Sequence, residues 1–129
     1  MIKRISAEES KTLINIENEA NTFIAEIDGA LIQTLSMYLT EVWNAFHFPK
    51  TGYVNYNAYL DWIRDLRWLE SDAYVLVIHN YHELISDSPK EREVVLASLE
   101  NIVLPWWNGE VERCVVGGKA KPFNVYLVE

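Results

Sequence analysis

The sequence predicts a small α/β domain in which a three-stranded parallel sheet is layered with helices. Half of the 129 residues are apolar, with only five Gly and four Pro, which suits a single domain over residues 1–129. Strand-like segments alternate with segments whose apolar residues recur at helical spacing. Residues 73–78 (AYVLVI) are apolar throughout, as expected for a strand covered by helices on both faces of a parallel sheet.

The first part of the chain contains one undecided segment and one clear strand. Residues 1–21 are polar and mixed in charge, and we treat them as an N-terminal extension. Their short apolar cluster fits either an edge strand or a helical turn, and consists of Leu13, Ile14 and Ile16. Residues 22–27 are rich in β-branched and aromatic side chains and end at the turn dipeptide Asp28-Gly29, which predicts the first strand.

Two helices are predicted before the central strand. Residues 35–46 carry apolar side chains at helical spacing, and Thr34 precedes them as a potential N-cap. Pro49 and Gly52 then interrupt the pattern. Residues 55–66 (NYNAYLDWIRDL) form the clearest amphipathic helix, whose apolar stripe consists of Tyr56, Tyr59, Leu60, Ile63 and Leu66.

The second half predicts one long helix and a final strand. After the strand at 73–78 and a helical turn near 81–85, a capping box with Pro at the first helical position opens a helix over 89–103. Pro105 is expected to end this helix. Residues 105–109 (PWWNG) predict an exposed corner, residues 111–116 a possible short strand and residues 123–128 the last strand.

Net charge and apolar patterning limit the classes of partner. A formal charge of −8 disfavours nucleic acid and anionic membranes, which reward Lys and Arg, and favours a basic partner. No segment approaches the roughly 20 apolar residues that span a bilayer. The single Cys114 and the polar start of the chain lead us to expect a reducing cytoplasm.

The sequence contains none of the catalytic motifs that we searched for, so we expect a protein that is not an enzyme and has no cofactor. It lacks a Gly-rich phosphate loop, a GxSxG and an HExxH motif. His79 and His82 are spaced as metal ligands would be on a helix, but His79 ends a predicted strand, so no metal site is predicted. Cys114, beside Val115 and Val116, is expected to be a small buried side chain rather than a nucleophile.

One flank of the 55–66 helix is polar. At about 100° per residue, Asn57, Asp61 and Asp65 form a column one turn apart, away from the apolar stripe. Trp62 falls at the edge of the stripe, which indicates a surface used for contact. The alternative is a merely solvated face with Trp62 lying under the neighbouring loop.

The order of elements and the residues of this helix resemble the barstar-like ribonuclease inhibitors. The resemblance runs from about residue 22 to residue 85. It rests on a strand ending in IDGA, a helix, Phe48-Pro49, and the segment Asn55-Tyr56-Asn57-Ala58-Tyr59-Leu60-Asp61 with Leu66 beyond. In the family this segment looks like N-(apolar)-D-A-L-x-D-x-L, on a three-stranded parallel sheet layered with helices. Compared with the family pattern, residues 104–121 look like an insertion before the final strand.

The resemblance implies a function as an inhibitor or immunity protein. Family members block a basic secreted ribonuclease, or ribonuclease toxin, by placing this helix and the preceding loop in its active-site cleft, where acidic side chains replace RNA phosphates. Asp61 matches the central carboxylate, whereas Asn57 replaces the preceding acidic residue and brings no charge. The aromatic residue before the helix shifts to Tyr53, within Thr51-Gly52-Tyr53. Together with the helical pattern, which adds Trp62 and Asp65, the resemblance leads us to expect these partner-binding residues: Tyr53, Asn55, Asn57, Leu60, Asp61, Trp62, Asp65 and, on the last helix, Glu100.

A second function stays open at this point. The same fold could serve as a non-catalytic interaction domain for another partner, for instance through Trp106 and Trp107. These adjacent side chains are expected to diverge, one packing inward and the other staying partly exposed. The sequence leaves the target, the affinity and the oligomeric state undetermined.

Overall fold

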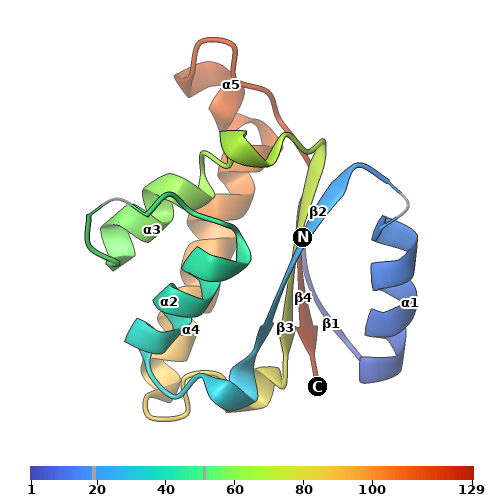
Figure 1. Cartoon of the computed structure of the whole chain (residues 1–129), viewed down its shortest axis with the longest axis vertical. Helices are drawn as coiled ribbons and strands as arrows, with labels where there is room; N and C mark the ends of the chain where they lie inside the picture. Colours follow the sequence, from blue (N-terminus) through green and yellow to red (C-terminus); the bar gives the residue numbers. More distant parts are fainter. Residues whose placement is uncertain (19, 51) are drawn as a thin grey trace.

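Among the described residues the sheet is parallel, as predicted, and it has four strands rather than three. The computed structural model describes residues 1–18, 20–50 and 52–129 (Figure 1). The strands lie in the order β1-β4-β3-β2, and their bounds are Ile2–Ile5 (β1), Thr22–Asp28 (β2), Ala73–His79 (β3) and Phe123–Val128 (β4). All neighbouring strands pair in parallel. The three predicted strands are therefore confirmed, and β1 is an addition.

The N-terminal extension is part of the sheet. Strand β1 pairs with β4, with Ile2 opposite Val125, and helix α1 (Ala7–Asn18) follows. Of the two alternatives left open for the cluster at residues 13–16, the helical one is correct. Leu13 and Ile14 pack on a sheet face that includes Val77. Figure 1 shows α1 alone on this side of the sheet, with the other helices on the opposite side.

The opposite face carries the main core under α2 (Leu35–Ala45), α3 (Tyr56–Ile63) and α4 (Pro89–Ser98). Their starts are fixed by side-chain caps: Thr34 Oγ1 accepts from the Met37 amide at 3.1 Å, and Asn55 Oδ1 accepts from the Ala58 amide at 2.9 Å. Ser88 caps α4 as predicted. Short 3₁₀ turns connect these elements at Gly29–Leu31, Arg67–Leu69 and Tyr81–Glu83.

Strand β3 is buried on both faces, which confirms the prediction from its apolar run. The side chains from Tyr74 to Ile78 are each at most 1% exposed. On the main core side, the Tyr38 and Tyr59 hydroxyls hydrogen-bond at 2.8 Å, so these two buried polar groups satisfy one another. Within the described residues, no helix is long and apolar enough to cross a membrane.

The segment over residues 104–121 differs from its prediction. Pro105 does not end the helix, because helical turns continue across it from Leu99–Val103 to Trp106–Glu110. The helix breaks at Gly109, whose backbone angles (φ 168°, ψ −28°) are not helical, and the short helix α5 (Val111–Cys114) follows this kink. The Leu104 amide donates to the Leu99 carbonyl, and this widened turn accommodates a proline ring that would clash in a regular α-helix. The possible strand at 111–116 is therefore wrong. The expectation that Cys114 is buried is also wrong, since it is exposed.

Candidate partner-binding site

Helix α3 presents one buried face and one free polar face. Tyr59 and Ile63 are fully buried, whereas Asn57 and Asp61 are exposed. This arrangement confirms the amphipathic pattern of the sequence. Figure 1 shows α3 and the loop before it at the outer side of the helical layer, away from the sheet. The polar face of α3 is thus accessible to another protein.

Asp61 does not stand alone on this face. Its side chain is 78% exposed, and its Oδ1 accepts from an Arg64 terminal nitrogen at 3.3 Å. The Arg64 Nε donates to the Leu60 carbonyl at 2.9 Å, and the guanidinium lies 5.4 Å from the centre of the Trp106 ring. These contacts hold a cation beside the carboxylate.

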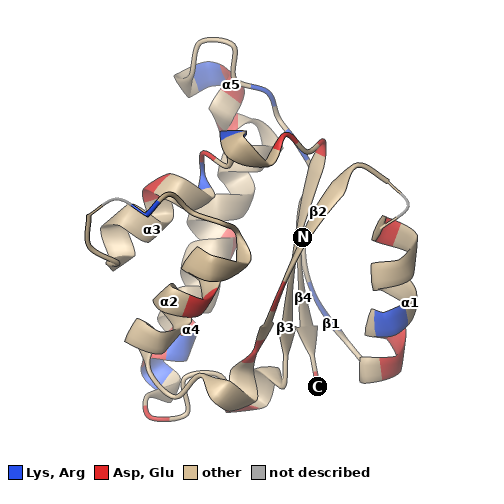
Figure 2. Cartoon of the chain, in the orientation of Figure 1, with Lys and Arg blue, Asp and Glu red and all other residues tan. Residues whose placement is uncertain are grey.

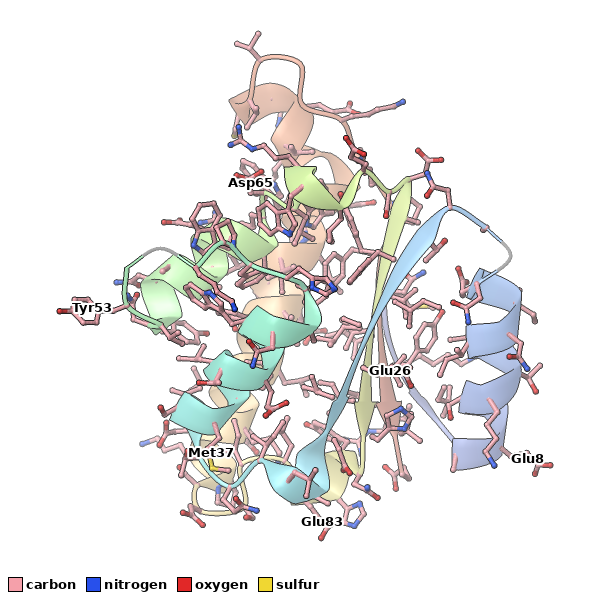
Figure 3. The ribbon with its side chains drawn as sticks, in the orientation of Figure 1. Glu8, Glu26, Met37, Tyr53, Asp65 and Glu83 are labelled. Atoms are coloured by element: carbon pink, nitrogen blue, oxygen red, sulfur yellow. The ribbon has the colours of Figure 1, made fainter. Side chains whose placement is uncertain are left out.

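The expected column of polar side chains stops at Asp61. Helix α3 ends at Ile63, and Leu66 adopts a left-handed backbone conformation (φ 55°). Asp65 therefore lies beyond the helix and accepts two hydrogen bonds of 2.8 Å from the Arg67 guanidinium. These hydrogen bonds hold the pKa of Asp65 below its usual range. Figure 3 shows Asp65 near the end of α3 that faces α5.

The loop before α3 carries the most exposed aromatic side chain of the predicted site. Tyr53 is 89% exposed and points away from the domain (Figure 3), and its neighbour Val54 is 45% exposed. The Asn55 side-chain amide donates to the Tyr53 carbonyl at 3.1 Å, which ties the loop to the start of α3. Thr51, the first residue of this motif, lies outside the described residues.

Three of the predicted contact residues, Trp62, Leu60 and Glu100, contribute less to the free face of α3 than expected. Trp62 is half-buried and packs edge-to-face on Trp68 at 5.6 Å, as in the alternative that placed it under the neighbouring loop. Leu60 is also half-buried. Glu100 is exposed on the π-helical turn, where it lines a pocket to which no α3 residue contributes. The structure therefore does not bring Glu100 and Asp61 into one pocket.

The two adjacent tryptophans diverge as predicted. Trp107 is 4% exposed, whereas Trp106 is half-buried. Both indole N–H groups donate to carbonyls at the end of α3: Trp107 to Ile63 at 3.0 Å and Trp106 to Arg64 at 2.8 Å. Since the last carbonyls of a helix lack partners within it, the tryptophans satisfy the C-terminal end of α3. The segment over 104–121 thereby positions the predicted binding helix.

A pocket of about 560 Å³ lies between the end of α3 and α5, and it was not predicted from the sequence. We call it the α3–α5 pocket. Its lining includes Asp61, Arg64, Trp106 and Lys121. These residues come from separate segments, which is why sequence spacing could not predict the pocket. Figure 2 shows Lys and Arg segments around α5 and the end of α3, with Asp and Glu segments among them.

His79 and His82 make separate contacts. His79 Nε2 lies 2.9 Å from Glu26 Oε1 across β2 and β3, whereas His82 is exposed and lies 3.9 Å from Glu83. The two imidazoles are thus used separately. In the part of the chain that the structure describes, no group of three or more His, Cys, Asp or Glu side chains could hold a metal ion.

A comparison with protein-family models matches most of the chain. The family model described as Barstar (barnase inhibitor) matches residues 22–127. This range begins with β2 and ends within β4, so β1 and α1 precede it and the segment over 104–121 lies inside it. Searches of curated proteins and of solved structures found no significant match.

Proposed function

Because the chain belongs to the barstar family of barnase inhibitors, we propose that it inhibits a basic ribonuclease by covering the active-site cleft with α3 and the loop before it. The partner in this proposal is a secreted ribonuclease or ribonuclease toxin, and the inhibitor acts in the cytoplasm. The observation that carries the proposal is the free polar face of α3, which displays Asp61 at 78% exposure, together with the exposed Tyr53 in the loop before the helix.

The charges support recognition of a basic cleft. The net charge of −8 attracts a basic protein from a distance and accelerates encounter, a mechanism for which barnase and its inhibitor are themselves the reference example. On contact, Asp61 loses water and pairs with a cation of the cleft. Asn57 adds a hydrogen bond without adding charge. Tyr53 supplies apolar contact area, as aromatic side chains commonly do in protein interfaces.

The test is inhibition of a ribonuclease encoded beside this gene, or of barnase, by the wild type and by Asp61→Ala. Removing one partner of a buried ion pair leaves the opposing cation unpaired, so we expect dissociation to become at least about tenfold faster. Glu93→Ala removes the same charge from an exposed position on α4 and serves as the matched control. It should leave the dissociation rate unchanged.

Asn57→Asp tests the same face in the opposite direction. It restores the acidic residue of the family pattern at an exposed position one turn before Asp61. Binding to a ribonuclease with a uniformly basic cleft should become tighter. Two results would overturn the assignment of α3 as the inhibitory face. One is that the wild type inhibits neither the ribonuclease encoded beside this gene nor barnase, and the other is that the Asp61→Ala protein is as potent as the wild type.

A further inference from the structure

We propose that the α3–α5 pocket receives a carboxylate side chain of the partner ribonuclease, an inference that rests on the function proposed above. The pocket adjoins the predicted inhibitory face, because Asp61 belongs to both. A partner that covers Asp61 therefore also lies over the mouth of the pocket. Trp106, Trp107 and Val111 are among the side chains that line it, so an inserted side chain would be partly shielded from water.

The charges that line the pocket favour an anion. Four cations and two carboxylates contribute to it. Both carboxylates are already engaged within the chain, Asp61 with Arg64 at 3.3 Å and Asp65 with Arg67 at 2.8 Å. Two lysines, Lys119 and Lys121, make no ion pair with a described residue. The pocket is therefore locally positive in a chain whose net charge is −8.

Lys121 is the best-placed donor for the incoming carboxylate. Its Nζ donates to the Ser71 carbonyl at 2.7 Å and to the Tyr74 hydroxyl at 3.3 Å, and both acceptors are neutral. An ammonium carries three N–H donors, so one is available to a further acceptor. The Lys121 amide also donates to the Trp107 carbonyl at 3.1 Å. Because these bonds already fix the side chain, little conformational entropy is lost when a ligand binds.

Arg64 connects the pocket to Asp61. Its guanidinium lies over Trp106 and beside Asp61, and its side chain is 30% exposed. A cleft that is basic throughout would attract Asp61 and repel Arg64. A cleft that places a carboxylate next to its cation would satisfy both side chains. The Asp61–Arg64 pair thus discriminates between ribonucleases. A ribonuclease without a carboxylate next to its cation would leave Arg64 buried and unpaired in the complex, which would weaken binding.

An RNA phosphate is a less suitable occupant than a protein carboxylate. Nucleic acid binding depends on several cations that neutralise successive phosphates, and the remaining surface of this chain is acidic. A carboxylate carried by a basic protein enters the same pocket without that long-range repulsion. We therefore assign the pocket to the partner protein and make RNA binding one outcome of the test.

The experiment measures binding of the inhibited ribonuclease to wild type, Arg64→Gln and Lys121→Gln at two salt concentrations. Each variant should raise the dissociation constant about tenfold or more, because the partner carboxylate loses a cation in a shielded site. Lys90→Gln removes the same charge from an exposed position on α4 and should stay within about twofold of wild type. Lys119→Gln, exposed at the pocket, should weaken binding by a smaller factor without disturbing internal contacts.

A double-mutant cycle identifies the partner group. Each Asp or Glu of the ribonuclease cleft is replaced by its amide and combined with Arg64→Gln and with Lys121→Gln, and at least one cleft carboxylate should couple to them. Tighter or unchanged binding by both variants, or no coupling to any cleft carboxylate, overturns the proposal. So does binding of a labelled single-stranded RNA that Arg64→Gln abolishes. Failure of the wild type to inhibit refutes the proposed function itself, and that result is visible before any variant is compared.

Discussion

Replacing Trp107 by Phe should loosen α3 without changing the surface that α3 presents to a partner. The Trp107 indole is 4% exposed and donates to the carbonyl of Ile63, the last residue of α3, at 3.0 Å. Phe retains an aromatic ring but has no donor, so the carbonyl is left without its partner inside the protein. Such an unsatisfied buried group costs about 1–3 kcal/mol, a large share of the roughly 5–15 kcal/mol that stabilises a typical domain.

Trp106→Phe is the matched control for this substitution. It removes a hydrogen bond of 2.8 Å to the adjacent carbonyl of Arg64, but the Trp106 side chain is half-buried and water can replace the lost donor. The expected cost is therefore about 0.5–1.5 kcal/mol. Urea unfolding measures both costs, and the slope of the transition should stay constant. At this chain length, each kcal/mol should lower the melting temperature by about 2–4 °C or slightly more.

Hydrogen exchange locates the effect. In Trp107→Phe, amides of α3 should exchange faster relative to those of β3, because the helix opens locally more often than the domain unfolds. Equal destabilisation by the two substitutions, or unchanged protection of α3 in Trp107→Phe, would refute the reasoning that the indole fixes the end of this helix.

Three further predictions concern the core. Tyr59→Phe leaves the buried Tyr38 hydroxyl unpaired, so the double substitution of both tyrosines should destabilise less than the sum of the single ones in urea unfolding. Burial raises the pKa of both the Tyr38 and the Tyr59 hydroxyl in the folded protein. In the unfolded chain these hydroxyls ionise at about pH 10, so the stability that they contribute is complete below that pH and is lost as the pH rises above it. Absorbance titration of tyrosinate should detect this unfolding. Gly29→Ala places a Cβ 2.5 Å from the Asn80 carbonyl oxygen and should cost about 1–3 kcal/mol in thermal unfolding, whereas Gly52→Ala (φ 72°) meets no atom within 4 Å and should cost less.

Sequence reasoning succeeded where one local rule controlled the outcome. The apolar run of β3, the Thr34 and Ser88 caps and the amphipathic pattern of α3 each depend on residues adjacent in sequence or in one helix. Sequence reasoning failed where the local structure depends on contacts with distant segments or on an unusual backbone conformation. Pro105 continues a helix because a π-helical turn precedes it.

In the candidate site, too, the features set by local sequence were predicted and those set by distant contacts were not. The exposure of Asn57 and Asp61 follows from helical periodicity, and the structure agrees with it. Asp65 leaves the column because the helix ends at Ile63. The link from Arg64 to Trp106 joins residues 42 positions apart through one hydrogen bond. No pattern in the sequence specifies that contact, although the adjacent Trp pair did mark the segment as unusual.

The place of β4 in the sheet has a consequence for biosynthesis. Strand β4 lies between β1 and β3, so residues 2–5 pair with residues 125–128. During translation, β1 has no neighbour and β3 exposes one edge until residues 123–128 leave the ribosome. Contacts between such distant residues form slowly, and unpaired strand edges promote aggregation. The nascent chain should therefore acquire its native sheet in a late step, after residues 123–128 have been synthesised.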